Sequence, residues 1–197
     1  MNYVTHLSKD KKLAKIIGAD LHELKLQKNI PLRLMASILS QQLSTKVAAV
    51  IFNRFLELYD GKVPQPQQVL DTPSETLRSI GLSNAKTGYV KNVAAFCIEH
   101  AVTDKKLAKM QNEEIAELLV QIKGVGRWTV EMLLMFSLGR EDVFAVDDLG
   151  IQQAMTRIYQ LDAADKKSMK EKMQQISAAW SPYRTYACLH LWQWKDQ

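Results

Sequence analysis

The sequence has only two cysteines, Cys97 and Cys188, among its 197 residues. Two thiols cannot build a disulfide framework, and they cannot supply the four ligands of a structural zinc or iron–sulfur site. Long apolar runs are also missing, because stretches such as 47–52 and 132–138 fall well short of the roughly 18 residues that cross a bilayer. The first residues lack the pattern of a secretory signal. We therefore expect an intracellular protein without membrane contact.

Positive charge is only slightly in excess of negative charge. Apolar residues make up 47% and charged residues 24% of the chain, which excludes a disordered protein. The 26 Lys and Arg outnumber the 21 Asp and Glu, for a net charge of +5. This excess is compatible with a polyanionic partner such as nucleic acid, and solubility alone also explains it.

Strict alternation of apolar and polar residues, which marks strands, is hard to find, whereas apolar residues recur at spacings of three and four. The pattern predicts an all-α protein. Joints rich in turn residues, with no repeat or flexible linker, favour an irregular orthogonal bundle. The helices are expected at residues 8–26, 32–39, 44–59, 67–70, 73–81, 84–100, 112–120, 127–138, 147–159, 165–176 and 182–194.

The most informative local motif is Ile122-Lys-Gly-Val-Gly-Arg-Trp-Thr129, which lies between an amphipathic helix and an apolar one. Gly124 and Gly126 let the backbone turn tightly and approach another molecule closely. Their N–H groups, together with the start of the next helix, form a site suited to a phosphate oxygen, and Lys123 and Arg127 flank it. A plain turn between two helices is the alternative.

An acid pair, Asp147 and Asp148, begins a later helix, and Asp148 follows Trp128 by 20 residues (148 − 128). Carboxylates at this place usually cap the helix, because they accept its N–H groups and complement its dipole.

The order of these features, a helix-hairpin-helix, a loop containing Gly139 and an aspartate at a helix start, resembles the HhH-GPD superfamily of base-excision DNA glycosylases. The resemblance selects Asp148, three residues before Ile151, as the essential carboxylate. Its role would be to stabilise the positive charge that develops on the sugar and to orient water. Asp147 is then expected to be the cap or an orienting neighbour.

The resemblance also gives the hairpin a role. It implies that the hairpin holds one DNA strand by its backbone, with contacts from Lys123, Gly124, Val125, Gly126, Arg127 and Thr129. It further implies that the backbone carbonyls of Val120, Ile122 and Val125 hold a structural Na⁺ or K⁺ ion. No other cofactor is expected.

Two features narrow the choice among the branches of the family. The iron–sulfur branch needs four cysteines near the C-terminus, and only Cys188 lies there. Bifunctional members carry a lysine nucleophile directly after the arginine of the hairpin, where this chain has Trp128. The resemblance therefore implies a monofunctional enzyme, which removes a base without cutting the strand.

Two further stretches point to one branch of the family. Ser40-Gln-Gln-Leu-Ser44 is similar to the family turn that enters the duplex, with Gln42 as the wedge that fills the gap; a polar turn between helices is the alternative. Residues 180–192 are similar to the C-terminal motif of alkylation-repair glycosylases of the 3-methyladenine DNA glycosylase II type. Trp128 and Trp192 match the family's pocket tryptophans, whose indole faces attract a cationic alkylated purine.

Five other positions carry an expected role. Met132 stands where a bacterial relative has a pocket tyrosine, and core packing explains it equally well. Arg184 is expected to contact phosphate or to pair with Asp147. Trp180 and Trp194 are expected to be structural, and His190 to pack between helices.

Taken together, the resemblance implies a single catalytic unit over residues 1–197, without the N-terminal β domain of the bacterial relative. Its two lobes are expected at 31–145 and at 1–30 plus 146–197, with the cleft between them. The expected function is excision of alkylated purines, typically 3-methyladenine and 7-methylguanine, from damaged double-stranded DNA by a monomer. The alternatives are the same scaffold acting on deaminated or etheno-modified bases, and a noncatalytic DNA-binding module.

Overall fold

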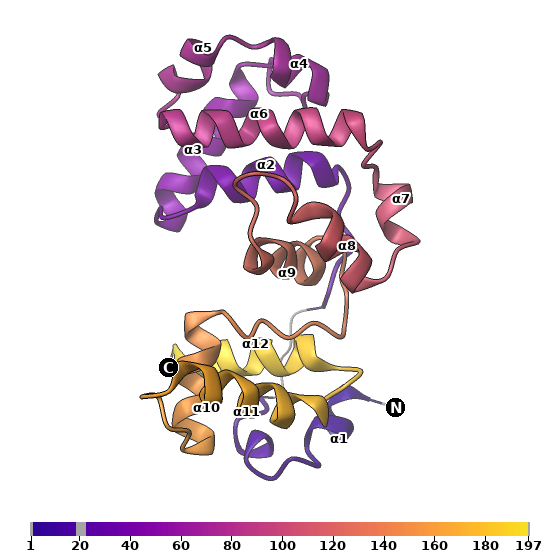
Figure 1. The fold of residues 1–197 in the computed structure, drawn as a ribbon, viewed down its shortest axis with the longest axis vertical. Coiled ribbons are helices and arrows are strands. Elements are labelled where there is room, and N and C mark those ends of the chain that lie inside the picture. The colour runs from indigo at the N-terminus through magenta and orange to yellow at the C-terminus, as the bar shows by residue number, and fades with distance from the viewer. Residues whose placement is uncertain (1, 19–22, 197) are drawn as a thin grey trace. The chain divides into compact units, whose positions relative to one another are not determined.

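A computed structural model describes residues 2–18 and 23–196. Every regular element within these ranges is a helix, and no strand occurs there (Figure 1). The predicted all-α class is therefore confirmed.

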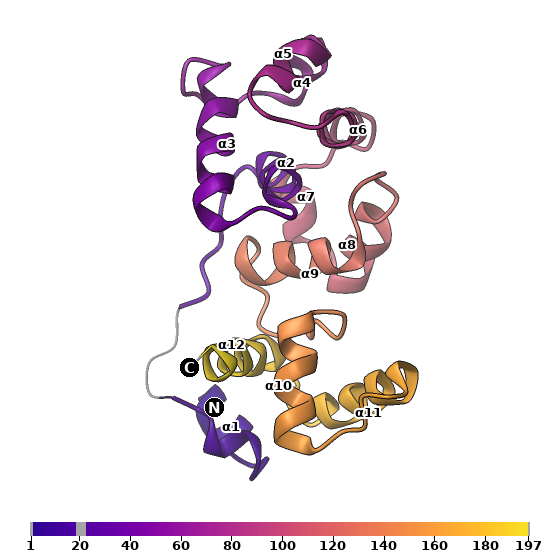
Figure 2. The same cartoon turned by 90° about the vertical axis from the view of Figure 1, so that its left-hand side faces the viewer.

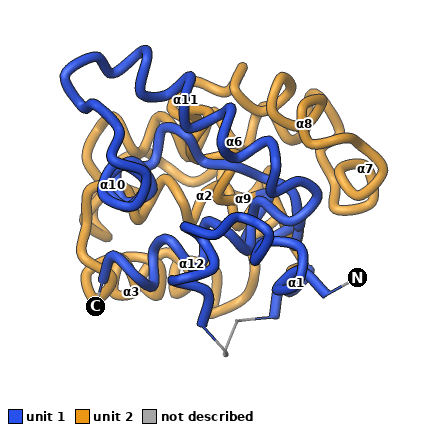
Figure 3. Tube along the Cα trace, turned by 90° about the horizontal axis from the view of Figure 1, so that it is seen from below, with its two compact units in different colours: residues 1–26, 134–197 blue, residues 27–133 orange. Residues whose placement is uncertain are grey.

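Contacts divide the chain into two compact units, which Figure 3 colours separately. Unit 1 comprises residues 1–26 and 134–197, and unit 2 comprises residues 27–133. The lobe boundaries expected from the sequence lie between residues 30 and 31 and between residues 145 and 146. The boundaries of the two contact units lie between residues 26 and 27 and between residues 133 and 134. The second unit boundary, at residues 133 and 134, lies inside helix α9 (Arg127–Phe136).

Unit 2 is built around α2 (Ile30–Ser40), which packs against α3 and α6 (Figure 2). Its side chains Leu34, Ile38 and Leu39 are fully buried, as expected of a helix with apolar residues on several sides. The carboxylate of Asp104 caps its start by accepting the N–H groups of Asn29 and Ile30, both at 2.8 Å. The other helices of unit 2 are α3 (Thr45–Glu57), α4 (Pro66–Asp71), α5 (Ser74–Ser79), α6 (Asn84–Glu99), α7 (Asp104–Ala108), α8 (Asn112–Leu119) and the first part of α9.

In unit 1, α10 packs against α11 and α12. The buried indole of Trp180 donates to Asp10 Oδ2 at 3.0 Å, which agrees with the structural role predicted for this tryptophan. His190 is fully buried, and its Nδ1 accepts the N–H of Gly18 at 3.3 Å. The helices of unit 1 are α1 (Tyr3–Leu7), a short 3-10 turn (Leu13–Lys15), α10 (Leu149–Tyr159), α11 (Lys166–Ala178), α12 (Arg184–Lys195) and the end of α9.

The long helix expected at 8–26 is wrong for its described part, which holds only the turn Leu13–Lys15; residues 19–22 lie outside the described residues. Asp10 explains the difference. Its Oδ1 accepts the N–H groups of Lys12 and Leu13, and its Oδ2 accepts bonds from Tyr159 and Trp180. The tertiary bonds from Tyr159 and Trp180 outweigh local helix propensity.

Candidate functional site

The glycine hairpin joins α8 to α9. Gly124 has φ +104°, and a Cβ there would collide with the ring of Tyr89, so both conformation and packing require glycine. Gly126 differs, because a Cβ at that position would meet nothing within 4 Å. The backbone beside Gly126 therefore lies open at the start of α9, where N–H groups and the helix dipole favour an anion.

The two cations that flank the hairpin have different surroundings. Arg127 forms a bidentate ion pair with Glu113 at 2.6 and 2.7 Å, and its Nε lies 3.4 Å from Glu131. The hydrogen bond from Arg127 lowers the pKa of Glu113, and that bond raises the pKa of Arg127. Lys123 is exposed, and its carbonyl accepts a bond from Asn92 at 3.2 Å. The charge of Arg127 is thus largely compensated within the protein, whereas Lys123 faces solvent.

The carbonyls expected to hold an alkali ion belong to the same turn. Ile122 O accepts the N–H of Val125 at 2.9 Å, and a carbonyl oxygen keeps a second lone pair after one such bond. Val120 is exposed at the end of α8. Carbonyl oxygens are the ligands that replace the hydration shell of K⁺ in proteins. The donor set therefore fits such an ion chemically.

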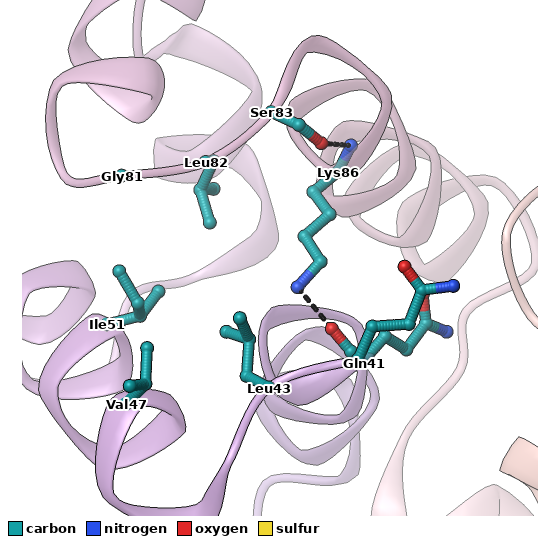
Figure 4. Close-up of a pocket in the computed structure, with 9 residues that line it drawn as sticks. Gln41, Leu43, Val47, Ile51, Gly81, Leu82, Ser83 and Lys86 are labelled. Carbon is teal, nitrogen blue, oxygen red and sulfur yellow. Dashed lines mark hydrogen bonds between the residues drawn. The ribbon is translucent and has the colours of Figure 1, made fainter.

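The turn between α2 and α3 carries Gln42, which is exposed and has φ +59°. This left-handed conformation is uncommon for residues other than glycine. Gln41 ties the turn to the hairpin, because its Nε2 donates to Gly124 O at 3.3 Å. A pocket of about 290 Å³ adjoins the turn, and the apolar side chains of Leu43 and Leu82 extend into it (Figure 4).

Asp148 is the N-cap of α10. Its Oδ1 accepts the N–H of Ile151 at 2.9 Å and the indole Nε1–H of Trp192 at 2.8 Å. The neighbouring Asp147 instead pairs with Lys170 on α11 at 2.6 Å. Asp147 is therefore not the cap of α10, which was one of its two expected roles, because its side chain pairs with a lysine on another helix.

Trp192 lies on α12, close to the start of α10. Gly150 permits this approach, because a Cβ there would lie 3.0 Å from Trp192 Cδ1 and 3.1 Å from Asp148 Oδ1. The indole also lies near Phe136, whose ring centre is 5.9 Å away and which is 44% exposed. Sequence reasoning missed Phe136, since one aromatic residue in the apolar run 132–138 gives no signal that separates it from the core.

The other predicted pocket residues lie on the part of α9 that belongs to unit 2. Trp128 is 43% exposed, Met132 is half-buried, and Thr129 is only 4% exposed. The side chain of Thr129 therefore has little surface to offer to DNA. Within unit 1, by contrast, the structure brings together Asp148, Trp192 and Phe136.

Arg184 does not pair with Asp147, which was one of its two expected roles. Its guanidinium pairs with Asp142, with Nε 2.6 Å from Oδ1 and Nη2 2.9 Å from Oδ2. Burial alone would raise the pKa of Asp142, but the bonds from Arg184 and Ser181 lower it. This bidentate pair joins the start of α12 to the loop after α9.

Three further features of the described residues concern metal ligands, thiols and membrane spans. No group of three or more His, Cys, Asp or Glu there is placed to hold a metal ion. Cys97 and Cys188 are both buried, and burial raises the pKa of the Cys97 thiol to about 12. No helix in the same ranges has the length and apolar character needed to span a membrane.

Comparison with known proteins yields one consistent result. Residues 35–179 match the family model of the HhH-GPD superfamily of base excision DNA repair proteins. DNA-3-methyladenine glycosylase 1 of Schizosaccharomyces pombe is 38% identical over 186 residues, which cover 93% of this chain and 80% of the relative.

Solved structures agree. A 3-methyladenine DNA glycosylase of S. pombe in complex with abasic DNA has a TM-score of 0.84 at 34% identity, covering 100% of this chain and 98% of that one. A DNA-3-methyladenine glycosidase of Bacillus halodurans has a TM-score of 0.86 at 34% identity, covering 99% and 89%.

Proposed function

Because the chain belongs to the HhH-GPD superfamily of base excision DNA repair proteins, we propose that it is a DNA glycosylase that hydrolyses the N-glycosidic bond of alkylated purines in double-stranded DNA. One observation carries the proposal: the carboxylate of Asp148 is held at a helix start by the indole of Trp192, 2.8 Å away. The glycosylase names of the relatives support the same reaction.

The carboxylate supplies the chemistry. Breaking the bond between sugar and base leaves positive charge on the sugar, which a fixed anion stabilises. Ile151 N–H and Trp192 Nε1–H both donate to Oδ1 of Asp148, so the carboxylate has little freedom to reorient. The N-terminus of α10 also favours a negative charge at this place. Asp148 would additionally orient the water that attacks the sugar.

Aromatic faces account for the choice of base. A purine alkylated on a ring nitrogen is cationic, and a cation over an aromatic face is attracted by the ring quadrupole. Trp192 and Phe136 form such a surface beside Asp148, and we assign Trp128 and Met132 to base binding as well. A neutral purine lacks this attraction.

The hairpin and the Gln42 turn would hold the DNA. Backbone N–H groups near Gly126 would bind a phosphate, and Lys123 would add a charge contact. Gln42, exposed at the α2–α3 turn, would fill the space left by the extruded base. The carbonyls of the hairpin turn would hold a Na⁺ or K⁺ ion that helps to fix the turn.

Trp128 occupies the place of the lysine nucleophile of bifunctional members, so no Schiff base with the sugar is expected there. The strand should stay intact until alkali or another enzyme cleaves the abasic site. We place the protein wherever the genomic DNA is, in the nucleoid of a bacterium or the nucleus of a eukaryote.

The test uses duplex oligonucleotides, each with one lesion: 7-methylguanine, ethenoadenine, hypoxanthine or uracil. Loss of 7-methylguanine, followed by strand cleavage only after alkali, supports the proposal. Activity confined to hypoxanthine or uracil would reject alkylpurine excision. Tight DNA binding without release of any base would identify a noncatalytic module.

A further inference from the structure

The end of α2 is followed by a residue other than glycine in the left-handed region. Helices often end on a glycine in the left-handed region, where a side chain is sterically disfavoured. Here the chain leaves α2 through Gln41, at φ −50° and ψ 130°, and then through Gln42 at φ +59°. The turn that presents Gln42 therefore needs support from elsewhere in unit 2.

That support comes from α6. The ammonium of Lys86 donates to Leu39 O at 2.9 Å and to Gln41 O at 2.6 Å, as the stick view of the pocket shows for Gln41 (Figure 4). These carbonyls stand at the C-terminus of α2, where helix carbonyls lack partners and a cation is favoured. Burial lowers the pKa of Lys86, so this ammonium gives up water to reach them.

We propose that Lys86 is a positioning residue for base excision, which holds the Gln42 turn in its projecting conformation. Its two bonds hold the carbonyls of Leu39 and Gln41, the second of which belongs to the residue directly before Gln42, so their loss frees the backbone that carries Gln42. The inference rests on the proposed function, since it assumes that Gln42 enters the duplex.

Lys91 provides a matched control. It lies on the same helix as Lys86, and it also donates to a carbonyl near the end of another helix, Leu70 O at 3.0 Å. Lys91 and Lys86 are chemically alike, but only Lys86 contacts the turn that carries Gln42. A general effect of losing one lysine bond from α6 would appear in both variants.

The experiment compares Lys86→Met with Lys91→Met in two assays. The first is single-turnover release of 7-methylguanine from a duplex. The second is the fluorescence of 2-aminopurine placed next to a stable abasic-site analogue, which reports insertion into the gap and requires no base release. We expect Lys86→Met to lose about tenfold in rate and most of the fluorescence change, because small misplacements are costly in catalysis. Lys91→Met should match the wild type in both.

A double variant decides whether Lys86 acts through Gln42. In a Gln42→Ala background, adding Lys86→Met should change either signal by less than twofold. The positioning role would be overturned if the effects of Lys86→Met and Gln42→Ala were fully additive. Equal results for Lys86→Met and Lys91→Met would overturn it as well. So would a wild-type fluorescence change that Gln42→Ala leaves intact. Absence of base release by the wild type with a normal fluorescence response would instead overturn the proposed function alone.

Discussion

The substitution Asp148→Asn should separate catalysis from folding. Asparagine keeps an Oδ1 that accepts the N–H of Ile151 and the indole of Trp192, and it is about as good an N-cap as aspartate. Only the negative charge is lost. Asp148→Ala removes the charge and both bonds.

The expected magnitudes follow from those contacts. For Asp148→Asn we expect a change in the free energy of unfolding below about 1 kcal/mol. For Asp148→Ala, the lost cap costs about 1 kcal/mol and the unpaired, half-buried indole of Trp192 about 1 kcal/mol more. That sum of about 2 kcal/mol lowers Tm by roughly 4–8 °C in a protein of this size. Both variants should lose about 10²- to 10³-fold in rate, as expected when one electrostatic stabiliser is removed.

The assay combines thermal unfolding with single-turnover base release from a 7-methylguanine duplex. Asp147→Asn is the control, because this neighbouring carboxylate pairs with Lys170 and should be dispensable for the reaction. Two results would refute the reasoning. One is an Asp148→Asn protein within tenfold of the wild-type rate, and the other is an equal loss in Asp147→Asn.

The remaining predictions concern the hairpin and the core. Gly124→Ala should destabilise unit 2 and weaken DNA binding, because a Cβ collides with Tyr89, whereas Gly126→Ala should fold normally; denaturation of both variants checks this. Burial lowers the pKa of His190 below its ordinary 6.5, so the unfolded chain takes up a proton that the folded chain resists. The free energy of unfolding should therefore fall as pH drops below about 6.5, and His190→Gln should flatten the dependence in urea titrations. The affinity for undamaged DNA should fall linearly on a log–log plot against salt, and Lys123→Gln should reduce that slope by about one; an unchanged slope would show that Lys123 binds no phosphate.

Much of the fold follows from local patterns. The helix after Ser44 was predictable because its apolar spacing and its cap agree, and Ser44 does accept the N–H of Val47. Residues 8–26 show the same kind of pattern, but the described residues 8–18 hold only a short 3-10 turn. Asp10 bonds to Tyr159 and Trp180, which are distant in sequence, and no local pattern reveals such partners.

In the candidate site, too, some features follow from the sequence and others depend on partners that are distant in the sequence. The resemblance to the family, whose essential aspartate precedes an aliphatic residue by three positions, selected Asp148 over Asp147. The bond from Trp192 spans 44 residues, and only folding reveals it. Arg127 appeared to be a free cation in the sequence, yet it is paired with Glu113. No local pattern marks Lys86, because its bond to Gln41 O spans 45 residues.

The central claim is that this chain releases alkylated purines from DNA by hydrolysis. The most direct measurement is chromatography of the bases set free when the wild-type protein is incubated with methylated genomic duplex DNA, with Asp148→Asn as the blank. The account predicts free 3-methyladenine and 7-methylguanine from the wild type, far less from the variant, and unbroken strands before alkali treatment. Equal amounts of these bases from both proteins, or none above the level without protein, would contradict it.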